Sequence, residues 1–276
     1  MTAAQKKQLL TTAVMAARSV GVVMKRNLMV DKKINEATQR DIKLELDVRC
    51  QRRIESLLTR AHPEIAILGE EENAGDIESD LRWVVDPIDG TVNFTYGIPH
   101  ACVSIALQQR LAKRNQYGEH YETIIGAVLD PFTDELWTAI RGQPSKLNGR
   151  KIRVSDGGLK ESMLSIGFAK DAKTLKYMMP YFSKLLPKIR KPRIMGSATL
   201  ALTYVACGRF HGYIESKVRL WDIAAGGLIV ECAGGEFWRL RREKEDYTFA
   251  IIASNGKIRK QVERQCGKLD PDGVLS

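Results

Sequence analysis

The segment 83–94, WVVDPIDGTVNF, contains two carboxylates spaced so that they can act together. Asp86 ends an apolar run, which is expected to place its side chain at the edge of a sheet. Pro87 cannot donate to a β-ladder, so the chain should turn there and bring Asp89 back beside Asp86. Two carboxylates this close repel each other unless a lysine, an arginine or a metal ion lies between them. The segment has no histidine or cysteine, so its ligands would be oxygen atoms, which suit magnesium and not zinc.

The next two residues are suited to binding a phosphate. Gly90 permits close approach of the backbone, and Thr91 could begin a helix whose free N–H groups point outward. Carboxylates, metal and amides would then converge on a phosphoryl group. The structural alternative is an Asp-Pro turn followed by an aspartate N-cap, which is common in proteins of every kind. The short motif alone leaves both interpretations open.

Two further acidic positions lie at the ends of predicted elements. Glu70 opens a run of three glutamates directly after the apolar residues 65–68, and Asp222 precedes an Ala/Gly-rich helix. Taken singly, Glu70 could lie in a solvated loop and Asp222 could simply cap the helix amides. Four acids beside turns or helix starts are harder to explain separately, and together they favour a cation site.

The elements of the first half are helices followed by β-rich segments. Apolar residues recur at helical spacing at Leu9, Leu10, Ala13, Val14, Ala17, Val20 and Met24. Residues 31–45 read as a loop or weak hairpin, and a second helix is expected over 46–60, ending before His62-Pro63. β-rich segments then follow at 65–72, 81–86, 100–110, 122–130, 135–142 and 151–156. This order predicts helices packed on an antiparallel-leaning sheet.

The second half alternates strands and helices. Strands are expected at 162–169, 193–197, 211–216 and 249–255, and helices at 174–189, 198–208, 222–235 and near the C-terminus. Such alternation favours parallel strands with crossover helices. Residues 156–158, Asp-Gly-Gly, are the expected seam between an N-terminal half, 1–155, that carries the metal site and a C-terminal half, 156–276, that adds Asp222 and the substrate pocket.

Composition restricts the class of protein. The 276 residues are 44% hydrophobic and 28% charged, which is typical of a globular protein. Five scattered cysteines without a CxxC pair argue against a disulfide framework or zinc site. No apolar run reaches the ~18 residues of a membrane span. We therefore expect a cytoplasmic protein without membrane attachment.

The net charge of +10 should attract anionic partners. A phosphorylated metabolite and a nucleic acid are both candidates. The basic residues are spread along the chain and not massed in one tail with interleaved aromatic residues, so a solvated basic surface is favoured over a nucleic-acid interface.

Three motifs in their order along the chain resemble the inositol monophosphatase family, magnesium-dependent and lithium-sensitive phosphatases. They are GEEE at 69–72, WVVDPIDGTVNFTYGIPHACVSIAL at 83–107 and WDIAAGGLIVECAGG at 221–235. The resemblance implies a layered αβαβα sandwich in the α/β (α+β) class, with an antiparallel sheet in the first half and a smaller mixed sheet in the second. It also implies a homodimer and hydrolysis of a phosphate monoester by metal-activated water.

The resemblance further implies a role for each acid of the site. Glu70, Asp86 and the Ile88 carbonyl would bind one magnesium ion, and Asp86, Asp89 and Asp222 a second. One magnesium would activate the attacking water and the other would neutralise the leaving alkoxide. Ions ~3.5–4 Å apart need a bridging carboxylate, which would be Asp86.

The residues expected to handle phosphate and water follow from the same resemblance. The amides of Gly90 and Thr91 would bind the phosphate, and the Thr91 hydroxyl, paired with Asp47, would orient the water. From the sequence alone, an exposed helix acid is the better interpretation of Asp47.

The substrate is less sharply defined. Gly196, Ser197 and Ala198 match the family's hydroxyl contacts and Glu215 its inositol-binding glutamate, although an ordinary strand-end acid explains Glu215 as well. Phe168 and Ala169 depart from the small polar residues of animal members. The expected substrate is myo-inositol 1-phosphate. The alternatives are a fructose bisphosphate, histidinol phosphate or adenosine bisphosphate, or binding to RNA and the transcription machinery in place of catalysis.

Overall fold

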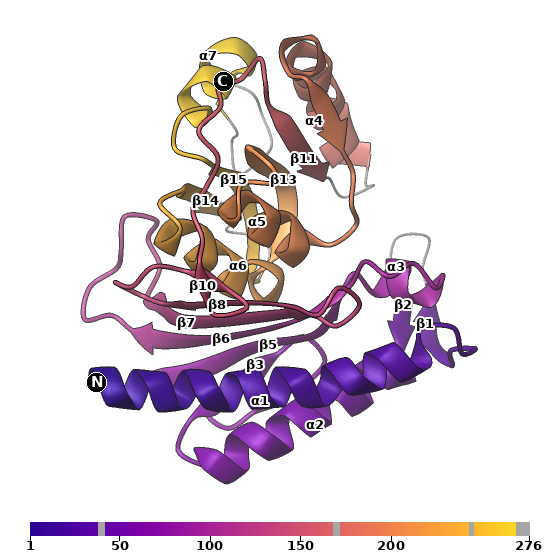
Figure 1. Cartoon of the computed structure of the whole chain (residues 1–276), viewed down its shortest axis with the longest axis vertical. Helices are drawn as coiled ribbons and strands as arrows, with labels where there is room; N and C mark the ends of the chain where they lie inside the picture. Colours follow the sequence, from indigo (N-terminus) through magenta and orange to yellow (C-terminus); the bar gives the residue numbers. More distant parts are fainter. Residues whose placement is uncertain (38–41, 168–171, 243–245, 269–276) are drawn as a thin grey trace.

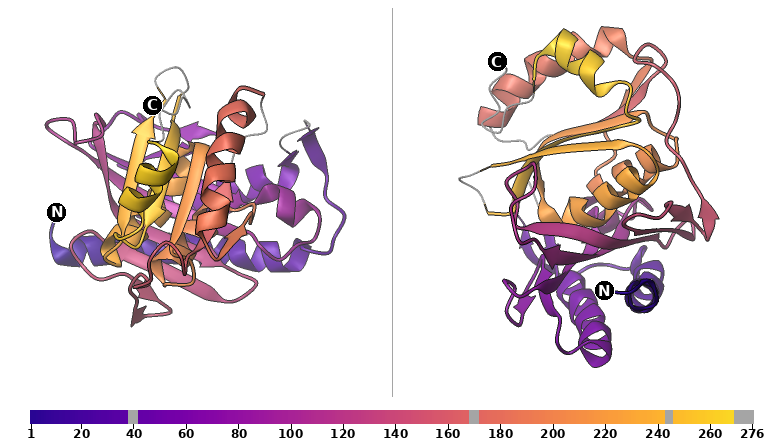
Figure 2. Two further views of the ribbon diagram at one scale, coloured as in Figure 1. Left: turned by 90° about the horizontal axis from the view of Figure 1, so that it is seen from above. Right: turned by 90° about the vertical axis from the view of Figure 1, so that its left-hand side faces the viewer.

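The chain folds into five layers that alternate helices and sheets, as Figures 1 and 2 show. This computed structural model describes residues 1–37, 42–167, 172–242 and 246–268. From one end of the molecule to the other, the layers are a helix pair, an eight-stranded sheet, a second helix pair, a five-stranded sheet and a third helix pair. The predicted αβαβα sandwich is confirmed.

The eight-stranded sheet is almost entirely antiparallel, and only β3 and β5 pair in parallel. Its strands, in spatial order, are β10 (Arg150–Lys151), β9 (Lys146–Leu147), β8 (Glu135–Ile140), β7 (Tyr121–Asp130), β6 (Cys102–Arg110), β5 (Leu81–Asp89), β3 (Ala66–Gly69) and β4 (Asn73–Ala74). Strands β5, β6 and β7 are buried along most of their length because helices cover both faces of the sheet.

Strand β5 corrects two expectations about the acidic turn. It lies inside the sheet, between β3 and β6, so Asp86 is not at a sheet edge. Pro87 also does not end the ladder. The pairing with β6 shifts register after Asp86, which pairs with Ser104, and resumes at Asp89, which pairs with Cys102. A bulge accommodates the proline because the residues within it need not donate to the neighbouring strand.

Helices α1 (Ala3–Asn27) and α2 (Glu45–Ala61) cover one face of this sheet. The apolar face of α1 is buried as its periodicity predicts, including Ala13, Val20 and Met24 at 0% exposure. Helix α2 ends at Ala61 with His62 as its C-cap, so the predicted stop before Pro63 is confirmed. The loop or weak hairpin expected before α2 is a hairpin of β1 (Ile34–Ala37) and β2 (Ile42–Leu44).

Helices α5 (Ala198–Ala206) and α6 (Leu220–Cys232) form the central helix layer, between the two sheets. Both are apolar on every side, and their buried residues join those of β5, β6, β7 and β13 in one hydrophobic core. The second half of the chain therefore packs directly on the sheet of the first half. The division at 156–158 remains a prediction.

The five-stranded sheet is mixed. Its order is β12 (Lys191–Arg193), β11 (Met163–Gly167), β13 (Gly212–Arg219), β15 (Thr248–Ser254) and β14 (Glu236–Arg241). Strand β11 runs parallel to β12 and β13, but β15 runs antiparallel to β13 and β14. The mixed sheet is confirmed, whereas the parallel order expected from β-α alternation holds only for β11, β12 and β13.

The outer helix layer and the short elements show where boundaries were hard to predict. The layer consists of α4 (Ala172–Leu185), the 3₁₀ turn Leu186–Lys188 and α7 (Arg259–Cys266). A strand was expected at 193–197, but the strand in this region, β12, covers 191–193. A strand was also expected at 151–156, but the strand there, β10, covers only 150–151. Strand β14 was missed because its sequence, EFWRLR, is rich in charge.

No helix in the described part of the chain is long and apolar enough to cross a membrane.

Candidate functional site

Three aspartates predicted as metal ligands converge in the structure. Asp86 and Asp89 come from the bulged end of β5, and Asp222 comes from the first turn of α6. One carboxylate oxygen from each lies within 4.8 Å of the others. The bulge in β5 and the packing of α6 on the sheet therefore bring together acids that are more than 130 residues apart in the sequence.

Hydrogen bonds hold one oxygen of each aspartate. Oδ1 of Asp86 accepts from the amide of Ile88 at 3.0 Å, and Oδ2 of Asp222 accepts from the amide of Arg219 at 2.9 Å. Oδ2 of Asp89 accepts from the Ser197 hydroxyl at 2.5 Å and the Thr199 amide at 2.8 Å. The carboxylates are thus fixed in orientation.

Glu70 completes the group of four acids expected from the sequence. It follows β3 directly, and its amide donates to the Val85 carbonyl at 3.1 Å, which ties it to β5. Burial raises the pKa of Glu70 well above its usual value, the charge of Asp222 raises it further, and a hydrogen bond with Asp86 acts in the opposite direction. Glu70 therefore lies beside the aspartates.

The electrostatics of this group favour a cation. Burial raises the pKa of Asp86 well above its usual value, and the charges of Glu70, Asp89 and Asp222 raise it further. Burial also raises the pKa of Asp222 to about 7, with a contribution from Asp89. Buried carboxylates that repel each other are stabilised when a cation binds between them. Because all the ligand atoms are oxygens, the group fits a hard divalent ion such as magnesium.

The backbone after Asp89 forms the predicted tight turn and helix start. Gly90 has φ +90°, and a Cβ atom there would lie 2.9 Å from the His100 carbonyl oxygen, so only glycine fits without strain. Helix α3 (Thr91–Thr95) begins directly afterwards. The Thr91 hydroxyl donates to the Ile88 carbonyl at 2.8 Å. This bond connects Thr91, which was expected to orient the water, to Ile88, which was expected to bind a metal ion.

Asp47 lies in the first turn of α2 and is buried, with 2% exposure, so it is not an exposed helix acid. Its Oδ2 accepts from the Leu44 amide at 2.9 Å. Its charge contributes to the raised pKa of Glu70, which places it within electrostatic reach of the acids. The expected pairing of Asp47 with Thr91 stays a prediction.

A cavity of about 530 Å³ adjoins the acids through Asp222. This volume is usual for a small-molecule site. The cavity includes four of the residues expected to contact substrate, namely Gly196, Ser197, Ala198 and Glu215. The apolar side chains in its wall belong to Val92, Ile166, Ile194, Met195 and Val218. Phe168 and Ala169, the departures noted in the sequence, lie outside the described residues.

Neighbouring residues fix Glu215 in this cavity. The Tyr213 hydroxyl donates to Oε2 of Glu215 at 2.7 Å. A Cβ atom at Gly167 would lie 1.7 Å from the same oxygen, so the absence of a side chain at this position makes room for the carboxylate. Burial raises the pKa of Glu215 to about 8, opposed by the Tyr213 hydrogen bond.

Sequence reasoning missed several residues that support the site. Thr199 donates its amide to the Asp89 carboxylate and its hydroxyl to the backbone carbonyl of Asp222 at 2.6 Å, so it links Asp89 to the first turn of α6. Asn93 donates to the carbonyls of His100 and Met195 and connects α3 to the loop before α5. Their contacts join distant parts of the chain, and no local pattern signals them.

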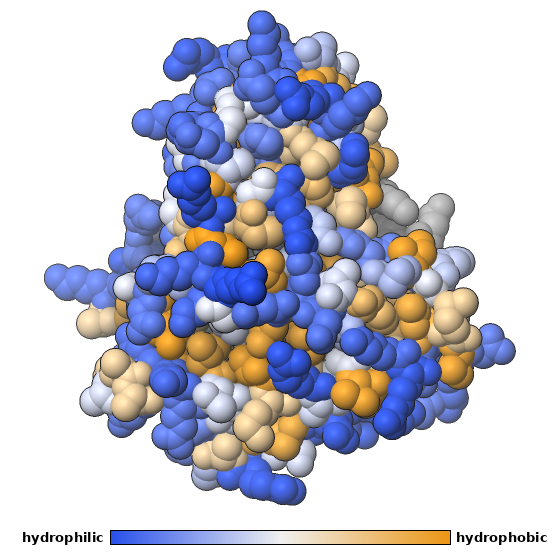
Figure 3. All heavy atoms as spheres, viewed as in Figure 1, coloured by the Kyte–Doolittle hydropathy of each residue, from blue (hydrophilic) through white to orange (hydrophobic). Residues whose placement is uncertain are grey.

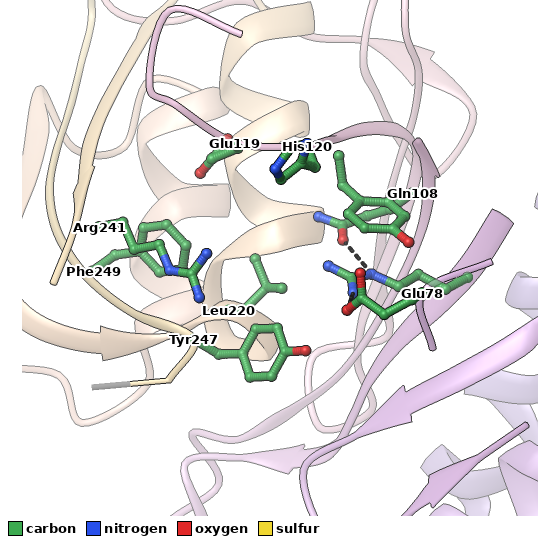
Figure 4. A pocket seen from close by; sticks show the side chains of 10 residues that line it. Glu78, Gln108, Glu119, His120, Leu220, Arg241, Tyr247 and Phe249 are labelled. Atoms are coloured by element: carbon green, nitrogen blue, oxygen red, sulfur yellow. Dashed lines mark hydrogen bonds and ion pairs between the residues drawn. The ribbon is translucent and has the colours of Figure 1, made fainter. Parts of the chain in front are cut away.

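A second cavity, of about 100 Å³, is drawn in Figure 4. Buried Arg82 lies here, with its guanidinium 3.6 Å from the Tyr121 ring centre and its Nε donating to Gln108 at 3.0 Å. Glu119, in the same wall, pairs with Arg239. Nη1 of Arg82 also lies 3.8 Å from Oε1 of Glu78, so Arg82 and Glu119 each have a partner of opposite charge within the protein.

Comparison with known proteins agrees with this geometry. The model of the inositol monophosphatase family matches residues 5–266. The chain is 38% identical over 236 residues to Nus factor SuhB of Xylella fastidiosa, covering 83% of this chain and 81% of that protein. It is 33% identical over 263 residues to inositol monophosphatase 1 of Solanum lycopersicum, covering 92% and 93%. The solved structure of extragenic suppressor protein suhB from Bartonella henselae superposes with a TM-score of 0.84 at 30% identity, covering 95% of this chain and 99% of that one.

Proposed function

Because the chain belongs to the inositol monophosphatase family, we propose that it is a magnesium-dependent phosphatase that hydrolyses a phosphate monoester. The observation that carries this proposal is the convergence of Asp86, Asp89 and Asp222 within 4.8 Å, beside Glu70 and a cavity of ligand size. Such a group of buried acids has no evident structural use without a cation.

The ligands assigned to magnesium divide into two sets. Glu70, Asp86 and the Ile88 carbonyl would hold one ion, and Asp86, Asp89 and Asp222 a second. Bound magnesium lowers the pKa of a water ligand and neutralises charge on the phosphate and the leaving alkoxide. Asp86 is assigned to both sets, and the charges of Glu70, Asp89 and Asp222, which all raise its pKa, support this assignment.

The protein's own groups would position water and phosphate. The Thr91 hydroxyl and Asp47 would orient the attacking water, and Glu70, on whose pKa Asp47 acts, would take part in catalysis with them. The amides of Gly90 and Thr91 bind the phosphate oxygens, and the positive φ of Gly90 lets the backbone approach them closely. In this proposal the Thr91–Ile88 hydrogen bond opens when the Ile88 carbonyl binds a cation.

The substrate proposed is myo-inositol 1-phosphate. Gly196, Ser197, Ala198 and Glu215 line the cavity and offer a carboxylate and polar groups for ring hydroxyls. Tyr213 and Gly167 hold Glu215 in a fixed position, as a specificity residue requires. A sugar or metabolite phosphate, such as a fructose bisphosphate or histidinol phosphate, is the alternative within the same reaction class.

Phosphate release with magnesium tests the function. Wild type should hydrolyse myo-inositol 1-phosphate, lithium should inhibit it, and Asp89→Asn should abolish release while the protein remains folded by circular dichroism. Asp156→Asn is the matched control, because Asp156 is an exposed acid whose only ion pair in the described structure is with Lys257. If wild type released no phosphate from any of a panel of sugar and polyol phosphates, the proposal that the protein is a phosphatase would be contradicted.

A second candidate function is binding to RNA within the transcription machinery, since some relatives are named Nus factors. One observation favours it: residues 172–193, which include α4, the 3₁₀ turn and β12, carry seven exposed cations and no acid. These are Lys173, Lys176, Lys184, Lys188, Arg190, Lys191 and Arg193. Figure 3 shows hydrophilic side chains over this end of the molecule. Salt-dependent binding of RNA, lost when four of these lysines are changed to glutamine, would support this function.

We also propose that the protein forms a homodimer and is located in the cytoplasm. Analytical ultracentrifugation tests the first, and a monomer at micromolar concentration would contradict it.

A further inference from the structure

The turn that contains Glu70 is held by a buried side chain to which the proposed chemistry assigns no role. Gln51 lies on α2, one turn after Asp47, and is 1% exposed. Its Oε1 accepts from the amide of Glu71 at 2.9 Å, and its Nε2 donates to the carbonyl of Glu72 at 2.7 Å. One side-chain amide therefore binds the backbone of the two residues that directly follow Glu70.

A neighbouring carboxylate fixes the orientation of this amide. Nε2 of Gln51 also donates to Oε1 of Glu55, one turn further along α2, at 2.8 Å. The Glu55 carboxylate and the Glu72 carbonyl can only accept, so both must face the amide nitrogen. The amide oxygen then faces the Glu71 N–H group, which can only donate. Both hydrogens and the oxygen of the amide are used, as its burial requires.

Gly69, the first residue of the GEEE motif, makes room for this contact. A Cβ atom at Gly69 would lie 2.3 Å from Nε2 of Gln51 and 2.4 Å from the Glu72 carbonyl oxygen. The φ angle of Gly69 is not positive, so close approach and not backbone conformation requires a glycine here. The short motif thus contains both a proposed metal ligand and the space that receives the side chain of Gln51.

Glu70 needs an anchor because neighbouring carboxylates repel its own. Burial and the charge of Asp222 both raise the pKa of Glu70, so its ionised form would be more stable in solvent than in the apo site. Its backbone is held on one side by the bond from its amide to the Val85 carbonyl at 3.1 Å, and on the other side by Gln51. A ligand held in place before the ion arrives binds it without a cost of reordering.

We propose that Gln51 is a positioning residue that keeps Glu70 directed toward the aspartates and thereby sets the affinity of the magnesium site to which Glu70 belongs. This inference rests on the proposed function and adds a residue to it. Gln51 contacts neither the ion nor the substrate and acts only through the backbone. The ion bound by Asp89 depends on it much less, because Ser197 and Thr199 hold that carboxylate.

Calorimetric titration with magnesium at pH 8 tests this in wild type, Gln51→Met, Glu70→Gln and the double variant. Gln51→Met keeps the length of the side chain and removes its hydrogen-bonding atoms. Gln8→Met, an exposed change on α1, is the matched control. Gln51→Glu keeps an acceptor for the Glu71 amide but sets a second carboxylate against Glu55, so it should weaken binding as well. It replaces Gln51→Met if circular dichroism shows that variant to be unfolded.

We expect Gln51→Met to weaken the binding of one magnesium ion about 10–100-fold, as for other partners that orient a metal ligand. The magnesium concentration for half-maximal activity should rise to match, while KM for myo-inositol 1-phosphate at saturating magnesium stays unchanged. In the Glu70→Gln background the same change should have little further effect, because Gln51 acts through Glu70. Gln8→Met should bind magnesium as wild type does.

Unchanged magnesium affinity in Gln51→Met, or an equally large loss in the Glu70→Gln background, would overturn the inference while hydrolysis by wild type continued. If wild type binds magnesium but hydrolyses no phosphate ester, the proposed function fails, and the calorimetric comparison still decides the role of Gln51. A wild type that binds no magnesium would overturn both.

Discussion

The Ser197 hydroxyl donates a 2.5 Å hydrogen bond to Oδ2 of Asp89, across 108 residues of sequence. Ser197 is also the N-cap of α5, accepting from the Leu200 amide at 3.2 Å. One side chain therefore begins a helix of the second half and orients an acid of the first half. Ser197 was expected to contact substrate, and the structure gives it this positioning contact in addition to a place in the cavity wall.

Replacing Ser197 by alanine should weaken magnesium binding. Without the hydroxyl, only the Thr199 amide and the weak Cys102 thiol donor at 3.8 Å remain to orient Oδ2 of Asp89. Loss of such a partner typically costs about 10–100-fold in metal affinity. The magnesium concentration for half-maximal activity should rise accordingly, while Ser183→Ala, an exposed change on α4, leaves it unaltered. An unchanged magnesium requirement in Ser197→Ala would show that Asp89 needs no such support.

Asp86 should matter more than Glu215. The charges of Glu70, Asp89 and Asp222 all act on Asp86, which belongs to both proposed ligand sets, so Asp86→Asn disturbs both. Glu215→Gln alters only a wall of the cavity. We expect Asp86→Asn to lower kcat/KM by more than about 100-fold, beyond the usual effect of losing a hydrogen-bonding partner of a metal ligand. Glu215→Gln should act mainly on KM. Equal losses in kcat/KM for the two variants would mean that these roles are wrongly assigned.

Magnesium should stabilise the fold more at pH 8 than at pH 5.5. Burial and mutual repulsion raise the folded-state pKa of Asp86, Glu70 and Asp222, the last to about 7. Such groups favour the fold at low pH, where they are protonated in both states, and this contribution is lost as pH rises toward and through their folded pKa values. Magnesium binds the ionised form and offsets the loss.

Differential scanning fluorimetry with EDTA or magnesium at the two pH values measures this effect. The increase in melting temperature on adding magnesium should be larger at pH 8, and Asp89→Asn should reduce it. A melting temperature unaffected by magnesium at either pH would count against a cation site among these acids.

Replacing Gly167 by alanine should displace Glu215. The new Cβ would lie 1.7 Å from Oε2 of Glu215, so this carboxylate must leave its hydrogen bond with Tyr213. KM for myo-inositol 1-phosphate should rise roughly 10-fold, the size of one hydrogen bond to a charged group, with the magnesium requirement unchanged. Gly158→Ala is the control, since its Cβ would meet only the end of the exposed Glu161 side chain. If Gly167→Ala were no longer activated by magnesium, Glu215 would not belong to the substrate wall alone but would also support metal binding.

Local patterns predicted much of the fold. The helical spacing of Leu9, Ala13, Val20 and Met24, and the His62-Pro63 stop, are short-range signals, and the structure confirms both α1 and the end of α2. Strand β14 was missed because it lies at the edge of its sheet, where charged side chains remain in solvent and the alternation of apolar residues is weak. The parallel order expected for the second half failed at β15 for a related reason: strand direction depends on where the chain re-enters the sheet, which residue types do not encode locally.

For the site, the sequence alone determined which residues could take part: acids without histidine or cysteine, a proline that breaks regular pairing, and a glycine where only glycine fits. These are properties of single residues and their neighbours. The tertiary structure alone decided that Asp222 meets Asp86 and Asp89, that Ser197 and Thr199 orient Asp89, and that Glu215 lies in the cavity wall. These contacts arise because α5 and α6 pack between the two sheets, and burial of their apolar faces fixes the relative positions of acids far apart in the chain.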